Sequence, residues 1–176
     1  MSGHNKWSKI KNKKAVTDAA KSKIFSKMAR LISVASKQVK GDVSSPILRA
    51  AIDKAREYNM PADNIERAVK KGAGSDAEAL EQITYEAYGP GGSALIIDAL
   101  TTNRNKAAQE VKFILSKRGV ALATPGSVTW AFVKEAGAWK PTTTIEISEE
   151  DGQVLEKLIE ELEDNDEVQD VYTNAL

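Results

Sequence analysis

The chain of 176 residues contains no cysteine and a single histidine, His4. It therefore has no disulfide, no thiolate metal site and no cysteine nucleophile. One histidine cannot by itself supply the convergent ligands or partners that a metal or acid–base centre needs. No apolar run is long enough to cross a bilayer, and the N-terminus lacks the apolar core of a signal peptide. These absences predict a cytoplasmic protein with no metal, no cofactor, no membrane partner and no small-molecule substrate.

Other motifs that carry chemistry are also missing. Gly89-Pro90-Gly91-Gly92 lacks the Lys-Ser/Thr that completes a phosphate-binding loop, and its proline removes a backbone donor, so we interpret it as a turn. The carboxylates between residues 146 and 167 lack the ligand spacing and central glycine of a calcium loop, which favours a solvated acidic helix. No Ser/His/Asp set can be assembled. We therefore expect a protein that is not an enzyme.

The formal net charge of zero conceals a strong polarity along the chain. Residues 1–71 carry 17 Lys and Arg against 6 Asp and Glu, residues 72–145 carry 7 of each, and residues 146–176 carry Lys157 against 12 acids. Between residues 1 and 41 the only acid is Asp18. A cationic segment of this kind repels itself unless a polyanion neutralises it, which favours contact with nucleic acid. A lysine-rich surface that serves only solubility would have acids interspersed among the lysines.

Apolar spacing in the first 75 residues predicts three helices. The first covers residues 17–40, with Thr17 as its N-cap, Gly41 just after its end, and a basic stripe opposite its apolar arc. The second begins at Pro46, with an inward arc that starts at Ile47, and the third begins at Pro61 and ends before Gly72. Because none of these helices is long enough to be stable alone, we expect them to pack together.

After a linker at residues 72–79, the pattern changes to a mixture of strands and helices. Strands are predicted at residues 83–88, 93–100, 128–133, 142–147 and 168–172. Helices are predicted at residues 103–117 and 148–163, the second starting with a capping-box pattern of Ser148 and Asp151. The expected class is α+β: a basic, N-terminal three-helix domain, residues 1–75, followed by a small α/β sandwich-like domain with a mixed sheet, residues 80–176.

Two groups of residues are candidate nucleic-acid contacts. The first starts in SGHNKWSKIKNKKA, residues 2–15, and continues on the first helix: Lys6, Trp7, Lys9, Lys11, Lys13, Lys14, Lys23, Lys27, Arg30 and Lys37. Trp7 could stack on an unpaired base or pin the N-terminal arm onto the helical domain. The second group is Arg104 and Lys106, since the start of a helix also favours anions. No set of Arg, Asn or Gln residues suited to reading base edges stands out.

Four stretches of the chain resemble the YebC/PmpR family. They are SGHNKWSKIKNKKAVTDAAKSKIFSKMARLI at residues 2–32, YEAYGPGGSALIIDALTTNRNKAAQEVK at 85–112, GSVTWAF at 126–132 and DEVQDVYTN at 166–174. The resemblance implies an N-terminal helical domain followed by α/β domains, and no enzymatic activity. It also implies a probable DNA-binding transcriptional regulator. A mitochondrial branch of the family is a translational activator, and bacterial relatives are linked to translation through proline-rich stretches on the ribosome.

One departure from the family pattern is plain. Family members usually carry a ferredoxin-like domain inserted between a GSVTWAF-type strand and a TTTIEIS-type strand. Here only KEAGAWKP, residues 134–141, joins the two stretches. We therefore expect a short form that lacks the inserted domain and any function resting on it, while the basic domain and the NRNKAAQEVK helix are complete.

The leading hypothesis is a non-enzymatic, nucleic-acid-binding regulator of gene expression, a probable DNA-binding transcriptional regulator of the YebC/PmpR type. One alternative is a ribosome- or RNA-bound translation factor, which needs shape and phosphate recognition more than base readout. A second alternative is a protein-interaction module whose basic and acidic ends pair between molecules. The sequence does not determine the oligomeric state, although a monomer is favoured.

Overall fold

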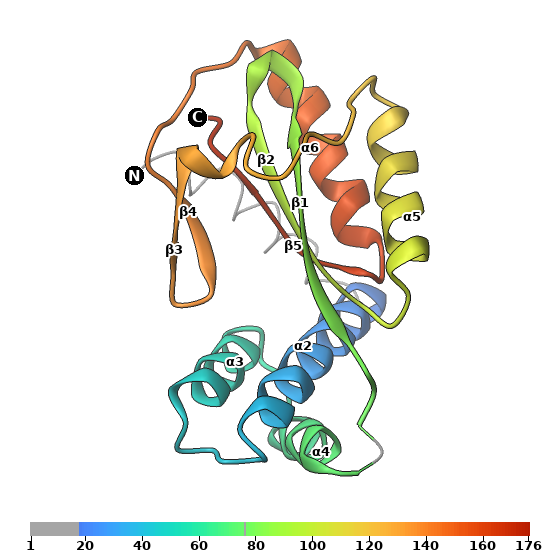
Figure 1. Ribbon diagram of the computed structural model, residues 1–176, viewed down its shortest axis with the longest axis vertical. Helices are drawn as coiled ribbons and strands as arrows, with labels where there is room; N and C mark the ends of the chain where they lie inside the picture. Colours follow the sequence, from blue (N-terminus) through green and yellow to red (C-terminus); the bar gives the residue numbers. More distant parts are fainter. Residues whose placement is uncertain (1–17, 76) are drawn as a thin grey trace. The chain divides into compact units, whose positions relative to one another are not determined.

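The computed structural model describes residues 18–75 and 77–176 (Figure 1). These residues fall into two compact units, one that ends at Leu80 and one that runs from Glu81 to Leu176. The first unit is helical, and the second combines antiparallel strands with helices, so the α+β class predicted from the sequence is confirmed. Each unit has a hydrophobic core of its own.

Three helices make up the described part of the helical unit, with bounds close to those predicted. They are α2 Asp18–Gln38, α3 Pro46–Glu57 and α4 Ala62–Ala73. Pro46 is the first residue of α3, where its missing N–H and fixed φ suit the helix start. After α2, Gly41 adopts a φ of 80° and its N–H donates to the Ser36 carbonyl at 2.9 Å. Thr17, the predicted N-cap of α2, lies outside the described residues.

The three helices bury a shared core of small and branched apolar side chains. Its members are Met28, Ile32, Ala35, Leu48, Ala51, Ile52, Ala55, Met60, Ile65 and Ala68. Ile47 was expected to face inward, but its side chain is 53% exposed, so that expectation is wrong. At 100° per residue it lies about 90° from the centre of the buried arc of α3, outside the stripe that the other helices cover.

A glycine lets α2 and α4 pack closely. The prediction that α4 ends before Gly72 is wrong, because the helix continues through this residue. A Cβ on Gly72 would lie 2.3 Å from the carbonyl oxygen of Ser33 and 2.8 Å from its Cα. Next to it, Ser33 Oγ donates to the Ala68 carbonyl at 3.1 Å, and Ser36 Oγ donates to the Val69 carbonyl at 2.6 Å. Gly72 therefore serves helix contact rather than helix termination.

The second unit is organised around a three-stranded sheet with the order β1-β2-β5. Its strands are β1 Glu81–Tyr88, β2 Ala94–Thr101 and β5 Val168–Thr173. Both ladders are antiparallel, so the prediction of a mixed sheet is wrong; among the described residues, the parallel pairing is confined to the isolated bridge between Ile145 and Ala175. The short connection between β1 and β2 dictates the first pairing, because parallel strands need a long crossover.

Two longer helices and several short elements complete this unit. They are η1 Pro90–Gly92, α5 Arg104–Ser116, η2 Thr129–Ala131, β3 Phe132–Glu135, β4 Ala138–Pro141 and α6 Glu149–Asp164. The predicted cap of α6 is present, since Ser148 Oγ accepts from the Asp151 N–H at 3.1 Å. The expected turn at residues 89–92 is the short helix η1, in which Gly91 and Gly92 have φ angles of 68° and 77°.

The central strand β2 is buried along its whole length and on both faces. Leu95 and Ile97 point to the face covered by α5 and α6, which lie side by side in Figure 1. Ala94 and Ile96 point to the other face, where η2 and the β3–β4 hairpin form a thin second layer. This double burial explains why the sequence of β2 is almost continuously apolar.

Two of the predicted strands differ from the structure. The stretch 128–133 begins as η2 and becomes strand only at Phe132, and residues 142–147 form no strand apart from the bridge at Ile145. The hairpin uses residues 138–141 instead. Asn174 holds the following segment with both its side chain and its backbone. Its side-chain Nδ2 donates to the Thr143 carbonyl, and its backbone carbonyl accepts from the Ile145 N–H, each at 3.0 Å. A segment that is extended in this way shows the alternation of apolar and polar residues typical of a strand, although it forms no ladder of backbone hydrogen bonds with a neighbouring strand.

We predict that Gly72→Ala lowers the free energy of unfolding by about 1–3 kcal/mol, the usual cost of overpacking. The added methyl group would force α4 away from the backbone of Ser33. Urea denaturation of the full chain measures the change. Helix propensity alone would favour alanine by about 1 kcal/mol, so a stabilised variant would contradict the close contact.

The turn of the β3–β4 hairpin generates a second prediction. Its two central residues, Ala136 and Gly137, have φ angles of 50° and 79°, as a type I′ turn requires. Alanine is strained there, whereas asparagine tolerates positive φ. Ala136→Asn should raise the free energy of unfolding by about 0.5–1 kcal/mol, and Ala136→Val should lower it. Equal melting temperatures for both variants would contradict this turn geometry.

One carboxyl group lies within the buried strand β2. Asp98 is buried opposite Asp170 of β5, and Thr84 Oγ1 donates to its Oδ1 at 2.8 Å. Burial raises the pKa of Asp98, an effect that the Thr84 hydrogen bond and the charge of Lys134 oppose and that Asp170 reinforces. The folded protein therefore holds a proton on this group at pH values where the unfolded chain has released it.

We predict that Asp98 makes the protein less stable as the pH rises. The folded-state pKa lies above the ordinary value, so the free energy of unfolding falls as the pH increases from the ordinary carboxyl pKa through the raised one. Asp98→Asn removes this titration and still presents an oxygen to Thr84. Chemical denaturation of both proteins across the acid range should show curves that diverge with pH; parallel curves would contradict the prediction.

Candidate nucleic-acid interface

The N-terminal part of the predicted interface lies outside the described residues. It comprises Lys6, Trp7, Lys9, Lys11, Lys13 and Lys14. Their role in nucleic-acid contact stays a prediction from the sequence.

The predicted basic stripe on α2 is only partly exposed. Lys23 and Lys37 are exposed, and Arg30 is half-buried. Lys27 is 8% exposed, so its predicted place on the solvent-facing side of the helix is wrong. At 100° per residue Lys27 lies about 80° from the centre of the apolar arc, between Ile24 and Leu31, where its aliphatic stem is covered.

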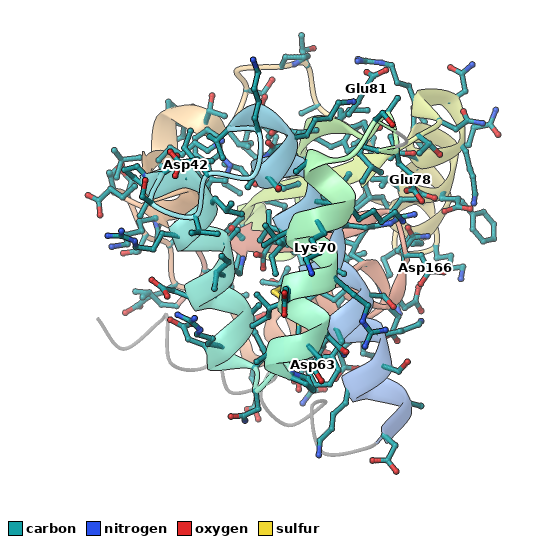
Figure 2. The ribbon with its side chains drawn as sticks, turned by 90° about the horizontal axis from the view of Figure 1, so that it is seen from below. Asp42, Asp63, Lys70, Glu78, Glu81 and Asp166 are labelled. Atoms are coloured by element: carbon teal, nitrogen blue, oxygen red, sulfur yellow. The ribbon has the colours of Figure 1, made fainter. Side chains whose placement is uncertain are left out.

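α4 adds cations that the sequence interpretation did not single out. Lys70 Nζ lies 3.0 Å from Glu66 Oε1, and Lys71 Nζ lies 3.0 Å from Glu78 Oε1. Figure 2 labels Lys70 and Glu78, together with Asp63 near the start of α4. All four charged side chains of these pairs are largely exposed, and such pairs contribute at most about 1 kcal/mol. A phosphate can therefore replace the carboxylate at little cost.

The second predicted group, at the start of α5, is engaged with carboxylates of its own unit. Asn103 caps the helix, with its Oδ1 accepting from the Lys106 N–H at 3.1 Å. Arg104 Nη1 lies 2.7 Å from Glu81 Oε2, and Lys106 Nζ lies 3.4 Å from Glu167 Oε1. Glu167 is buried, which makes the exchange of this carboxylate for a phosphate costly. Each of these two cations thus faces an acid of its own unit.

The α+β unit carries most of the acidic side chains. α6 begins with Glu149, Glu150 and Asp151 in its first turn, where the helix dipole stabilises negative charge. Arg118, two residues after the end of α5, is paired with α6: its Nη2 donates to Glu161 Oε1 at 2.9 Å, and this hydrogen bond lowers the pKa of Glu161. The cation at the end of α5 is therefore neutralised within the fold.

The described part of the chain has neither a cluster of metal ligands nor a helix suited to a membrane. Between residues 18 and 75 and from 77 onward, no three His, Asp or Glu side chains gather as ligands for a metal ion. In the same residues, no helix combines the length and the apolar character that crossing a membrane needs.

Two family descriptions match the chain. The description of the TACO1/YebC protein N-terminal domain matches residues 5–75. The description of the TACO1/YebC second and third domain matches residues 80–137 and 134–175. Together they extend over nearly the whole chain.

Individual relatives agree with these matches. A probable transcriptional regulatory protein of Fervidobacterium nodosum is 40% identical over 235 aligned positions, which cover 99% of this chain and 93% of that protein. A protein of the same description from Petrotoga mobilis is 44% identical, with 98% of this chain and 70% of that protein covered.

A solved structure also resembles the fold. The crystal structure of a conserved hypothetical protein from Aquifex aeolicus superposes with a TM-score of 0.78 at 31% sequence identity. The superposition covers 90% of this chain and 91% of that one. On these matches of sequence and fold, the chain belongs to the TACO1/YebC family.

Proposed function

We propose that this protein is a non-enzymatic regulator of gene expression that binds nucleic acid, a DNA-binding transcriptional regulator of the YebC/PmpR type. The observation that supports the proposal is the charge of α2, where Lys21, Lys23 and Lys37 are exposed and Arg30 is half-buried, against the single acid Asp18. The description of its relatives as probable transcriptional regulatory proteins agrees with this role.

Binding would depend on phosphate contacts. The cations of the N-terminal arm and α2 neutralise phosphates and release their counterions, so affinity falls with salt by a log–log slope of about −0.9 per contact on duplex DNA. Base edges are read by paired donors and acceptors on an exposed element, and no such set stands out on the basic helices within residues 18–75. We therefore expect similar affinity for different sequences.

A second candidate is an RNA- or ribosome-bound translation factor. The absence of a base-reading set on the basic helices favours it, because RNA helices are recognised mainly by shape, phosphates and 2′-hydroxyls. Both candidates use the same cationic surface and differ in the nucleic acid that it meets.

We also propose that this chain is a short form of the family, with a basic helical domain at residues 1–75 and an α+β domain at 80–176 that lacks the domain usually inserted at residues 134–141. Two observations support this. The description of the second and third family domain matches in two ranges, which overlap at residues 134–137; this overlap covers the end of β3 and the turn of the β3–β4 hairpin. The alignment to the Fervidobacterium protein needs 235 positions for a chain of 176 residues.

The charge-reversed variant Lys11→Glu, Lys13→Glu, Lys14→Glu should bind less tightly to all sequences alike. If each lysine contacts one phosphate, the salt slope flattens by about 2.7, or 0.9 per contact. Fluorescence anisotropy with labelled duplexes at several salt concentrations measures both effects. The matched control reverses Lys112, Lys134 and Lys140 of the α+β unit; equal losses in the two variants would contradict an N-terminal interface.

Separate experiments distinguish the two nucleic acids. At physiological salt, a DNA-binding regulator should be retained on genomic fragments and should not sediment with ribosomes. Sedimentation with ribosomes, together with no retention on any DNA fragment, would overturn the transcriptional proposal in favour of the translational one. Crosslinking in cells followed by sequencing of the attached RNA and DNA gives the same decision under native conditions.

A further inference from the structure

A groove of about 520 Å³ lies in the helical unit between α2 and α4, next to the segment 77–80. One wall comes from the α2 stretch 22–34 and the opposite wall from residues 60–71. Ser33 lines the groove and also contacts Gly72, so the tight helix contact described above lies beside the groove. The volume falls in the range of sites that hold small organic ligands, about 300–1,000 Å³.

Apolar side chains and cations both line the groove; we call the apolar pair Phe25 and Met60 its floor and the three cations named below its rim. Phe25 is half-buried and Met60 is buried, and both line it with their apolar atoms. Three cations, Arg30, Arg67 and Lys71, line the same groove. A flat apolar group and an anion are therefore the two features that a ligand would need.

The single acid among the described lining residues is Glu78, whose Oε1 lies 3.0 Å from Lys71 Nζ. Both side chains are about half exposed. Water screens such a pair strongly, and its contribution to stability is small. An incoming phosphate can therefore replace Glu78 beside Lys71. The guanidinium of Arg67 now donates to Asn64 Oδ1 at 3.0 Å, and it can turn to bind the same phosphate.

We propose that the groove between α2 and α4 binds one unpaired nucleotide of a single-stranded nucleic acid, with the base against Phe25 and Met60 and the phosphate among Arg30, Arg67 and Lys71. The proposal rests on the nucleic-acid binding proposed above and adds a site and a ligand class to it. A base inside a duplex is stacked on both sides and cannot reach the floor of the groove, so the site selects single strands. An acidic peptide would satisfy the rim but offers no flat ring for the floor.

Two matched pairs of variants test the groove in the full chain. Lys71→Ser removes a lining cation, and Lys70→Ser removes its neighbour on α4, which also has an exposed carboxylate partner but does not line the groove. Ser26→Phe places a bulky ring at an exposed position of the groove, and Ala50→Phe places one at an exposed position of α3 outside it. Thermal unfolding of the four variants serves as the control for correct folding.

The probes are short single-stranded RNA and DNA with one 2-aminopurine, and a duplex of the same sequence. We expect the wild type to change the 2-aminopurine fluorescence of single strands and to bind them more tightly than the duplex. Ser26→Phe should abolish the fluorescence change and weaken single-strand binding about fivefold or more, the usual effect of losing one base–aromatic stack. Lys71→Ser should weaken single-strand binding more than Lys70→Ser does, whereas the two variants should weaken duplex binding to a similar extent. Ala50→Phe should leave both affinities near their starting values, and Ser26→Phe should leave the duplex affinity near its starting value.

The failures of the two proposals look different. If the wild type binds no RNA, DNA or duplex at any salt concentration, the proposed function itself is overturned. If it binds nucleic acid but each groove variant matches its control, the groove proposal is overturned and the function stands. A polyglutamate peptide that displaces the 2-aminopurine strand as well as an unlabelled strand does would overturn the nucleotide as ligand. Stronger binding of RNA than of DNA identifies the 2′-hydroxyl as part of the recognised ligand.

Discussion

The burial of β2 on both faces is the constraint on which the α+β unit depends. A strand without a solvent-exposed face needs a cover on each side, and α5 with α6 covers one side while η2 and the β3–β4 hairpin cover the other. The strand also contains Asp98, which loses its hydration in this position and is compensated by the hydroxyl of Thr84. The thinner of the two layers buries a small apolar cluster against the sheet, and polar contacts add to this attachment.

Two buried polar side chains supply those contacts. Glu86 of β1 accepts from the backbone N–H groups of Gly126, Val128 and Thr129, at 2.6, 3.0 and 2.9 Å, and so shapes the loop that leads into η2. Asn174 accepts from the Ala94 N–H at 2.8 Å and also holds the segment before α6. Backbone donors in a buried loop need acceptors, and a carboxylate satisfies several of them at once. These contacts hold the loop before η2 and the segment before α6 in place without further strands in the sheet.

The distribution of ion pairs separates the two candidate interfaces. At the start of α5 each cation faces a carboxylate from a distant part of the same unit, one of them buried. On α3 and α4 the partners lie mostly three to seven residues away on exposed surface, as for Arg56 and Asp53 at 3.3 Å. Exposed local pairs are weak and exchange easily, so a polyanion can compete for these cations. We therefore favour the helical unit as the nucleic-acid-binding part of the protein, and the groove between α2 and α4 is consistent with the same charge pattern.

Local patterns in the sequence determined the class, most helix bounds, the α6 cap, the charge asymmetry and the family resemblance. These features depend on residues within a few positions of one another, such as Ser148 and Asp151, so periodicity and spacing reveal them. Tertiary structure alone decided that Gly72 lies inside a helix and that Lys27 is buried. It also decided that residues 138–141, and not residues 142–147, pair with β3. Each of these depends on a partner about 30 to 45 residues away or on the packing of a whole helix. Spacing along one segment carries no information about which backbone will lie against it.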